Sequence, residues 1–317
     1  MDRPGGIATQ SRRFNGAKRC ALVRLAALAL FACVAHGAEW DAASRIVEGA
    51  GGVPLVVHEW GNPDGIPVLL LHGFSFGAVA FEHQTGPIEE RLHFVAPDLR
   101  GHGLSAKPWT TEAYAGTALW ADDIARIVAA YALERPVIVG WSFGGYVAAN
   151  YLRHCGADCA SGLALVGSLA GLVPQPPRTD PEAFGMPPPR GDARADDYGD
   201  FYDAAGWLAR VMTYEAPGER AAQRKAMNIV MMPPMVRRAM AGLSLDNRDL
   251  PASLALPVLM IHGGMDGSVP PASVAAAVSA LPDADARLFE GSGHSPFAEQ
   301  PERFNAALLD FAVRVYR

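Results

Sequence analysis

The sequence has few cysteines and few charged side chains, and it lacks a basic face. Only four of its 317 residues are cysteine, and Cys155 and Cys159 are the two outside the amino-terminal region. Their Cys-x-x-x-Cys spacing lacks two further ligands nearby, which argues against a zinc site. Charged residues make up 19% and hydrophobic residues 50% of the chain, which suits a large buried core. The net charge of −6 argues against a nucleic-acid partner, because phosphate binding needs a basic face.

The amino-terminal region also lacks an apolar run that could span a bilayer comfortably. The uninterrupted run at residues 25–35 has about eleven residues, whereas a membrane-spanning helix needs about 20. Basic residues precede this run, and small residues at 35–38 offer a cleavage site. This pattern predicts a secretory signal peptide over residues 1–38, and therefore a periplasmic or secreted protein without a stable membrane span after cleavage. A retained anchor and a lipoprotein site ending at Cys33 are the alternatives.

Export has two consequences for the rest of the chain. Cleavage after Ala38 would remove six basic residues and one acidic residue and leave a net charge of about −11. In an oxidising compartment, Cys155 and Cys159 are close enough in the sequence to form a local disulfide. The closed loop is short, so such a bond would stabilise the fold only modestly.

One stretch, residues 136–145, carries the strongest chemical signal. Val137, Ile138 and Val139 are β-branched and apolar, which predicts a strand buried on both faces. The following residues 140–144 form a G-x-S-x-G pattern centred on Ser142, and helix-compatible spacing follows. Glycines at 140 and 144 would let a serine hydroxyl stand clear of a tight turn, where a Cβ would collide with the neighbouring strand or helix. The free N–H groups of the following helix would face a developing oxyanion.

Strands and helices alternate along most of the chain. Apolar runs at residues 53–60, 66–71, 92–97, 137–139, 163–166, 256–261 and 286–289 predict strands, and helical spacing is present at 111–132 and 301–316. This alternation predicts an α/β fold with a mostly parallel sheet and helices on both faces.

The alternation breaks between two of these strands. Residues 173–200 are rich in proline and charge, and residues 201–245 predict short helices with many methionines. We therefore expect a signal peptide (1–38), a core in two parts (39–171 and 251–317) and a helical cap insertion (172–250). The cap would lie over the carboxyl edge of the sheet. Its apolar residues are candidates for the substrate pocket or for plain cap core; the pocket candidates are Trp207, Phe201, Met231 and Met232.

Two later loops offer the partners that a serine nucleophile needs. Asp266 follows a buried strand, and His294 follows the next strand along the chain. Because parallel strands end at one edge of a sheet, both loops are expected beside Ser142. A base that takes the hydroxyl proton and an acid that orients the base activate a serine. The order Ser142, Asp266, His294 is the order expected for this kind of sheet.

These motifs together resemble the α/β-hydrolase superfamily, in its capped carboxylesterase, haloperoxidase and perhydrolase branch. The resemblance runs from about residue 53 to the end and is weakest in the cap. It implies Ser142 as the nucleophile, Asp266 as the orienting acid and His294 as the base. Serine at position 142 separates the chain from dehalogenases and epoxide hydrolases, which carry aspartate there. The backbone N–H groups of Phe74 and Phe143 would form the oxyanion hole.

Other polar residues are better explained by structure than by chemistry. His72 and His102 are expected to brace loops, and Asp98 and Arg100 to stabilise the loop that contains them. His262, at a strand end next to two glycines, is expected to have a structural role. Asp122 and Asp123 lie in a predicted long helix, where one of them would face solvent.

The sequence thus predicts a serine esterase that forms an acyl-enzyme on a small-molecule ester and needs no metal or organic cofactor. Cofactor-free perhydrolysis and amide or C–C bond hydrolysis with the same three residues are the alternatives. A binding module that keeps the residues without using them is the non-enzymatic alternative.

Overall fold

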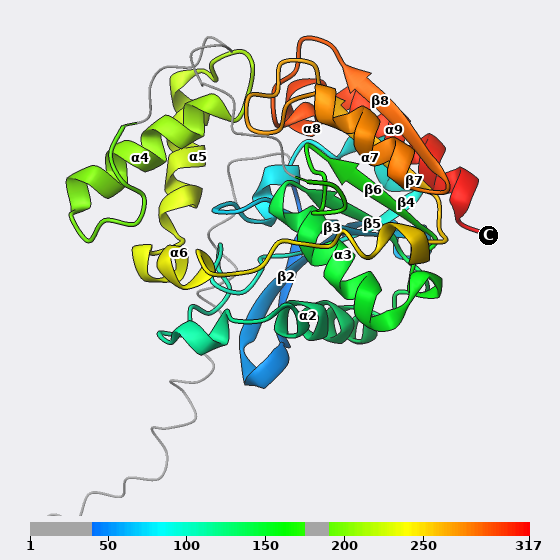
Figure 1. The fold of residues 1–317 in the computed structure, drawn as a ribbon, viewed down its shortest axis with the longest axis horizontal. Helices are drawn as coiled ribbons and strands as arrows, with labels where there is room; N and C mark the ends of the chain where they lie inside the picture. Colours follow the sequence, from blue (N-terminus) through cyan, green and yellow to red (C-terminus); the bar gives the residue numbers. More distant parts are fainter. Residues whose placement is uncertain (1–39, 175–189) are drawn as a thin grey trace, which may run out of the picture. The chain divides into compact units, whose positions relative to one another are not determined.

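The computed structural model describes residues 40–174 and 190–317, and its strands form one sheet in which most pairs are parallel (Figure 1). The spatial order is β1-β2-β4-β3-β5-β6-β7-β8. β1 and β4 both pair with β2 in the antiparallel sense, and the remaining neighbours pair in parallel. The strands are β1 (Ala43–Glu48), β2 (Pro54–Gly61), β3 (Ile66–Leu71), β4 (Leu92–Pro97), β5 (Val137–Trp141), β6 (Gly162–Val166), β7 (Val258–Gly263) and β8 (Ala284–Phe289).

Helices cover both faces of this sheet (Figure 1). Leu163 on β6 belongs to a core cluster with residues of α2 and α3. Its neighbour Gly162 points to the opposite face, where an added Cβ would lie 2.8 Å from Phe311 of α9. The helices are α2 (Thr117–Ala130), α3 (Phe143–Cys155), α4 (Tyr198–Val211), α5 (Glu219–Val230), α6 (Pro234–Met240), α7 (Ala272–Ala280), α8 (Pro296–Glu299) and α9 (Pro301–Val315). The predicted fold class, an α/β-hydrolase fold with helices on both faces, is confirmed.

Three helices, α4, α5 and α6, occupy the chain between β6 and β7 and lie together on one side in Figure 1. Hydrogen bonds attach them to the core. The amide of Tyr214, between α4 and α5, donates to Glu299 (2.7 Å), and Arg237 of α6 donates to the Ser75 hydroxyl (2.6 Å). We call the described part of this segment, residues 190–250, the cap. The domain boundaries at 172 and 250 stay a prediction.

Several details differ from the elements that the sequence predicts. β1 was not expected: its sequence ASRIVE has a single apolar pair, Ile46 and Val47, and only one of its six residues is buried. α2 begins at Thr117 rather than near residue 111, because Gly116 takes a positive φ of 84°. α7 was also missed, because its sequence ASVAAAVSA has little contrast between its faces.

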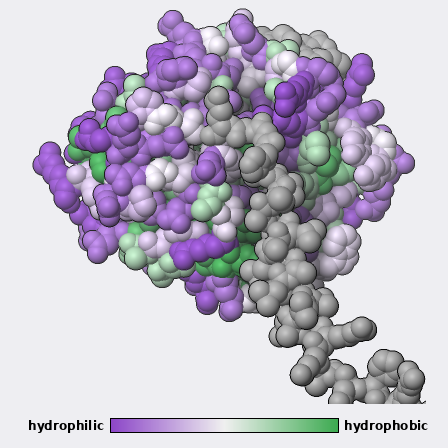
Figure 2. Space-filling model, turned by 180° about the vertical axis from the view of Figure 1, so that it is seen from behind, coloured by the Kyte–Doolittle hydropathy of each residue, from purple (hydrophilic) through white to green (hydrophobic). Residues whose placement is uncertain are grey.

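The disulfide expected near the end of α3 is present between Cys155 and Cys159, whose Cα atoms lie 6.0 Å apart. The predicted signal peptide lies outside the described residues and stays a prediction. Among residues 40–174 and 190–317, no helix is long and apolar enough to cross a membrane. The face seen in Figure 2 is mostly hydrophilic, with hydrophobic residues in scattered patches.

Candidate active site

Ser142 lies in a strained turn at the carboxyl end of β5. Its φ and ψ are 51° and −116°, and it is the residue that precedes α3. Its backbone is held on both sides, because its N–H donates to the Val166 carbonyl (2.9 Å) and its own carbonyl accepts from Ser168 Oγ (2.7 Å). A serine in this conformation costs free energy and persists only where the surroundings enforce it. We call residues 140–144 the elbow.

The two glycines of the elbow have the steric role that the sequence predicts. A Cβ on Gly144 would lie 2.0 Å from the carbonyl oxygen of Leu71 at the end of β3. A Cβ on Gly140 would lie 2.6 Å from the Cα of Gly145 in α3. Both contacts are with backbone, which cannot move aside as a flexible side chain can. The elbow therefore requires glycine at both positions.

Asp266 and His294 are joined directly. His294 donates from Nδ1 to Oδ2 of Asp266 at 2.8 Å, and the two side chains are 4% and 0% exposed. Asp266 lies in the loop after β7, and His294 lies in the loop after β8. Because Nδ1 carries the proton toward an acceptor-only carboxylate, Nε2 is left to accept one. This is the tautomer that a histidine base needs.

The carboxylate of Asp266 is held in its ionised form. Its Oδ1 accepts from the amides of Ser268 (2.8 Å) and Val269 (3.0 Å). Burial acts to raise the pKa of Asp266, but the charge and hydrogen bond of His294 and the nearby His262 outweigh it, so the pKa is lowered. His262 donates to the Val269 carbonyl (2.7 Å) and so braces the loop, which agrees with the structural role that the sequence predicts.

The His294 loop is fastened to the residue before Ser142. The indole Nε1 of Trp141 donates to the backbone carbonyl of His294 at 2.8 Å, and the two rings lie 5.8 Å apart between centroids. On the other side of His294, an added Cβ at Gly167 would lie 3.1 Å from Nδ1. In the described part of the chain, no hydrogen bond joins the Ser142 hydroxyl to His294. In many active sites such a hydrogen bond tightens when the substrate binds.

The two predicted oxyanion residues lie on adjoining turns. Phe143 opens α3, where the first N–H groups have no acceptor within the helix. Phe74 follows Gly73, and an added Cβ at Gly73 would lie 3.2 Å from Cβ of Ser142. The Phe74 and Phe143 rings meet edge to face at 6.2 Å. The turn after β3 therefore lies against the elbow.

Two buried histidines brace the loops beside this turn. His72 donates from Nδ1 to the Gly73 carbonyl (2.8 Å) and accepts at Nε2 from the Leu99 amide (2.9 Å). His102 donates from Nδ1 to the Arg100 carbonyl (2.9 Å). Burial lowers the pKa of His72, and it lowers the pKa of His102 well below the usual range. These contacts agree with the structural role that the sequence predicts.

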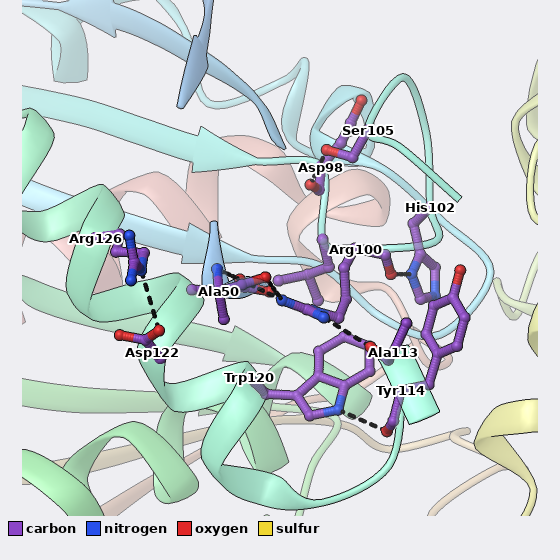
Figure 3. Close-up of polar contacts among 12 residues, drawn as sticks. Ala50, Asp98, Arg100, His102, Ser105, Ala113, Tyr114, Trp120, Asp122 and Arg126 are labelled. Atoms are coloured by element: carbon purple, nitrogen blue, oxygen red, sulfur yellow. Dashed lines mark hydrogen bonds and ion pairs between the residues drawn. The ribbon is translucent and has the colours of Figure 1, made fainter. Parts of the chain in front are cut away.

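Arg100 fastens the loop after β4 to α2 (Figure 3). Its Nε and Nη2 donate to the two carboxylate oxygens of Asp123, each at 2.6 Å, and its Nη1 donates to the Ala113 carbonyl at 2.6 Å. Asp98 in the same loop accepts from the amides of Ala78 and Leu104, each at 2.7 Å. Both residues stabilise loops, as the sequence predicts.

Glu299 is a supporting residue that the sequence analysis missed. Its carboxylate accepts from the amides of Gly293 (3.0 Å) and Ser295 (3.2 Å), which flank His294, and from the amide of Tyr214 in the cap (2.7 Å). It therefore braces the His294 loop and joins it to the cap. Its place five residues after His294 is the only sequence signal, and that spacing does not reveal backbone contacts.

A cavity of about 450 Å³ lies between the cap, the helix η3 (Ala78–Phe81) and residues 291–299, which include α8. Trp141, Phe76 and Met212 line it together with charged residues such as Lys225. Its described lining does not include the predicted pocket residues. Of these, Phe201 and Met232 are buried at 5% and 0% exposure, and Trp207 and Met231 are partly buried. Their contact with substrate stays a prediction.

Within the described ranges, no cluster of three or more His, Cys, Asp or Glu side chains is arranged to hold a metal ion. The side chains present fit proton transfer and nucleophilic attack. A strained serine, an aspartate-bound histidine and free helix N–H groups at one sheet edge are the parts that acyl transfer uses.

Known proteins resemble the chain over most of its length. A model of the alpha/beta hydrolase family matches residues 68–307. The pimeloyl-[acyl-carrier protein] methyl ester esterase of Edwardsiella ictaluri is 32% identical over 259 residues, covering 77% of this chain and 92% of that protein. The chain also resembles the crystal structure of the esterase RhEst1 from Rhodococcus sp. ECU1013, with 26% sequence identity and a TM-score of 0.72. This match covers 86% of this chain and 99% of that chain.

A second solved structure, assigned as an aryl esterase from Burkholderia cenocepacia, has 30% identity and a TM-score of 0.79, and covers 86% of this chain and 99% of that chain. The names of these three proteins are all esterase names, and each match covers most of both chains. The chain belongs to the alpha/beta hydrolase family.

Proposed function

We propose that the chain is a serine esterase that cleaves carboxylic esters through an acyl-enzyme, with Ser142 as nucleophile, His294 as base and Asp266 as orienting acid. The observation that carries this proposal is the joint presence of the strained Ser142 elbow and the Asp266–His294 hydrogen bond at carboxyl ends of strands in one sheet. Trp141 links the two halves, because its indole donates to the His294 carbonyl. Relatives with esterase names support the choice of ester over other bonds.

In the proposed reaction, Nε2 of His294 takes the proton of Ser142 as Oγ attacks the ester carbonyl carbon. The amides of Phe74 and Phe143 would donate to the oxyanion of the tetrahedral intermediate. The C–O bond to the alcohol then breaks, and the alcohol leaves with the proton from His294. Water, deprotonated by His294, attacks the acyl-enzyme and releases the acid and the free serine.

Asp266 would act through His294. Its ionised carboxylate keeps the proton on Nδ1 and stabilises the imidazolium that forms in each half of the cycle. The lowered pKa of Asp266 keeps it charged at neutral pH.

A fluorophosphonate probe tests the proposal most directly. We expect a covalent adduct on Ser142 in the folded protein and hydrolysis of p-nitrophenyl esters, screened from acetate to longer acyl chains. Ser142→Ala should abolish both. Ser279→Ala, at an exposed serine on α7, is the matched control and should change neither. Folded wild-type protein without an adduct on Ser142 would overturn the proposal.

The same three residues would also serve cofactor-free perhydrolysis or the hydrolysis of amide or C–C bonds. The leaving group is selected by the cap rather than by these residues. Peracid formation and ester hydrolysis measured in one preparation separate the two activities, and we expect ester hydrolysis to be the faster.

A further inference from the structure

The cap contains one buried arginine that reaches the core. Arg237 on α6 is 3% exposed. Its Nη2 donates to the Ile229 carbonyl (2.8 Å) in the last turn of α5, and its Nε donates to the Met232 carbonyl (3.2 Å) just after that helix. Its Nη1 crosses to the core and donates to Ser75 Oγ at 2.6 Å. One side chain thus holds two cap helices and a core loop together.

The core loop that Arg237 contacts is the turn after β3. Ser75 is fully buried and has a positive φ of 71°, which a non-glycine residue rarely adopts. It directly follows Phe74, whose amide is one of the two proposed oxyanion donors. The turn has one internal bond, from the Phe76 amide to the Gly73 carbonyl (3.1 Å). A strained turn with little internal support depends on outside contacts for its geometry.

The guanidinium also lies between aromatic rings of the core and the cap. Its central carbon is 5.7 Å from the centroid of the Phe74 ring and 5.5 Å from that of the Phe201 ring in α4. Cation–π attraction at these distances adds to the orientation of Phe74. Burial lowers the pKa of Arg237 to about 10, so the group remains charged at neutral pH. The ring of Phe74 in turn meets that of Phe143, the other proposed donor.

Two close approaches place the cap against the loops on either side of this contact. A Cβ added at Gly77 would lie 3.1 Å from Nδ2 of Asn228 in α5. A Cβ added at Gly101, in the loop after β4, would lie 2.7 Å from Val236 in α6. The cap therefore packs on both loops next to the elbow, and a shift of the cap would pull on Ser75 through Arg237.

We propose that Arg237 is a positioning residue that fixes the oxyanion turn, residues 73–76, to the cap, so that the placement of the cap sets the direction of the Phe74 amide. This inference rests on the proposed esterase function. It predicts that Arg237 acts on the transition state through Ser75 and Phe74, without touching the substrate.

The test compares Arg237→Met, Arg237→Lys and Ser75→Ala with wild type, using p-nitrophenyl acetate at a temperature well below each variant's melting temperature. We expect Arg237→Met to lower kcat by roughly ten- to a hundredfold with KM changed by less than about threefold, since losing a whole oxyanion donor costs about 10²–10³-fold. Arg237→Lys should retain part of the activity, because a lysine can reach Ser75 but cannot make the forked contacts.

Ser75→Ala keeps the hydrogen bonds of Arg237 inside the cap and removes only its hydrogen bond to the core. It therefore tests the proposal even if Arg237→Met fails to fold. Ser75→Ala should lower kcat as well. The double variant, with Arg237→Met and Ser75→Ala together, should have a kcat only slightly below that of the less active single variant, because both changes break the same contact. Affinity for a trifluoromethyl ketone, which forms a tetrahedral adduct, should fall in parallel with kcat/KM. Arg238→Met is the matched control, because Arg238 is the exposed neighbour bonded to Arg194 and Asp196.

Two outcomes separate this inference from the function on which it rests. If wild type is labelled on Ser142 and folded Arg237→Met keeps kcat and ketone affinity within about twofold, the positioning role is wrong and the esterase stands. If folded wild type is not labelled at all, the esterase proposal fails first.

Discussion

Ser142, Gly144, Asp266 and His294 illustrate how single residues define the site. Ser142 keeps its strained φ of 51° because Gly144, which has no Cβ, lets the start of α3 pack against the Leu71 carbonyl at the end of β3. The buried Asp266 holds His294 in one tautomer. These residues came directly from the sequence, because a G-x-S-x-G turn and two loops after strands have local signatures. Arg237 and Ser75 could not be found that way, since their contact joins residues 162 positions apart.

Asp266→Asn should lower kcat for ester hydrolysis by roughly 10³- to 10⁴-fold, because an amide can present its N–H to Nδ1 and favour the wrong histidine tautomer. Steady-state kinetics on p-nitrophenyl acetate measure the change. Asp310→Asn, at an exposed aspartate on α9, should leave kcat unaltered. A fully active Asp266→Asn enzyme would refute the orienting role.

Gly144→Ala should destabilise the protein strongly, by roughly 3 kcal/mol or more, because the new methyl group would meet the Leu71 carbonyl at 2.0 Å. Urea unfolding followed by tryptophan fluorescence gives the free energy of unfolding. Gly242→Ala places its methyl group in open space and serves as the comparison. Equal stability of the two variants would contradict the steric account of the elbow.

At the scale of elements, the loop after β4 is joined to α2 by a buried ion pair. Arg100 and Asp123 are 1% and 3% exposed at their side chains, whereas Asp122 and Arg126 on the same helix are 49% and 44% exposed. The sequence predicts that one of the two aspartates faces solvent, but helical periodicity alone does not say which. The structure decides it, because Asp123 faces the amide of Ala50 as well as Arg100.

Asp123→Asn should lower the free energy of unfolding by about 3–5 kcal/mol, because it leaves the buried guanidinium of Arg100 without its charge partner. Asp122→Asn should cost less than about 1 kcal/mol, since exposed pairs contribute little. The two neighbouring substitutions form a matched pair in chemical denaturation. Similar losses from both would show that burial does not govern the strength of this contact.

The sequence predicted the central elements better than the edge and the cap. β3 and β5 are continuous apolar runs, and β4 is interrupted only by His93, because helices cover these strands on both faces. Such runs are visible in the sequence. β1 is exposed on most of its length and α7 is rich in alanine, so neither has a periodic pattern. The cavity lining was not predicted, because it combines four separate parts of the chain that only the fold brings together.

For the whole molecule, buried titratable groups determine how stability depends on pH. Burial lowers the pKa of His72, His102 and His262 below the ordinary 6.5, so the unfolded chain binds more protons than the folded chain as the pH falls below that value. Burial alone would raise the pKa of the Asp98 and Asp266 carboxyls, but histidine neighbours and amide donors lower it. The stability that these carboxylates add is present above their unfolded pKa, near 3.8, and is lost as the pH falls through the folded value.

Both sets of groups therefore destabilise the protein in acid. We expect the free energy of unfolding in urea to be lower at pH 5 than at pH 7.5, and to fall further below about pH 4. His102→Gln should flatten the first part of this curve if the variant folds, and His154→Gln, at an exposed histidine, should leave the curve unchanged. A free energy of unfolding that is constant from pH 7.5 to 5 would contradict the prediction.

The carboxylate of Glu299 accepts hydrogen bonds from three amides, those of Gly293, Ser295 and Tyr214. It uses main-chain donors, so a cap transplanted from another member of the family could keep this attachment with any side chain at position 214 other than proline. Chimaeras that exchange cap sequences to alter substrate range should therefore preserve the backbone path at that point, whatever residues they change around it.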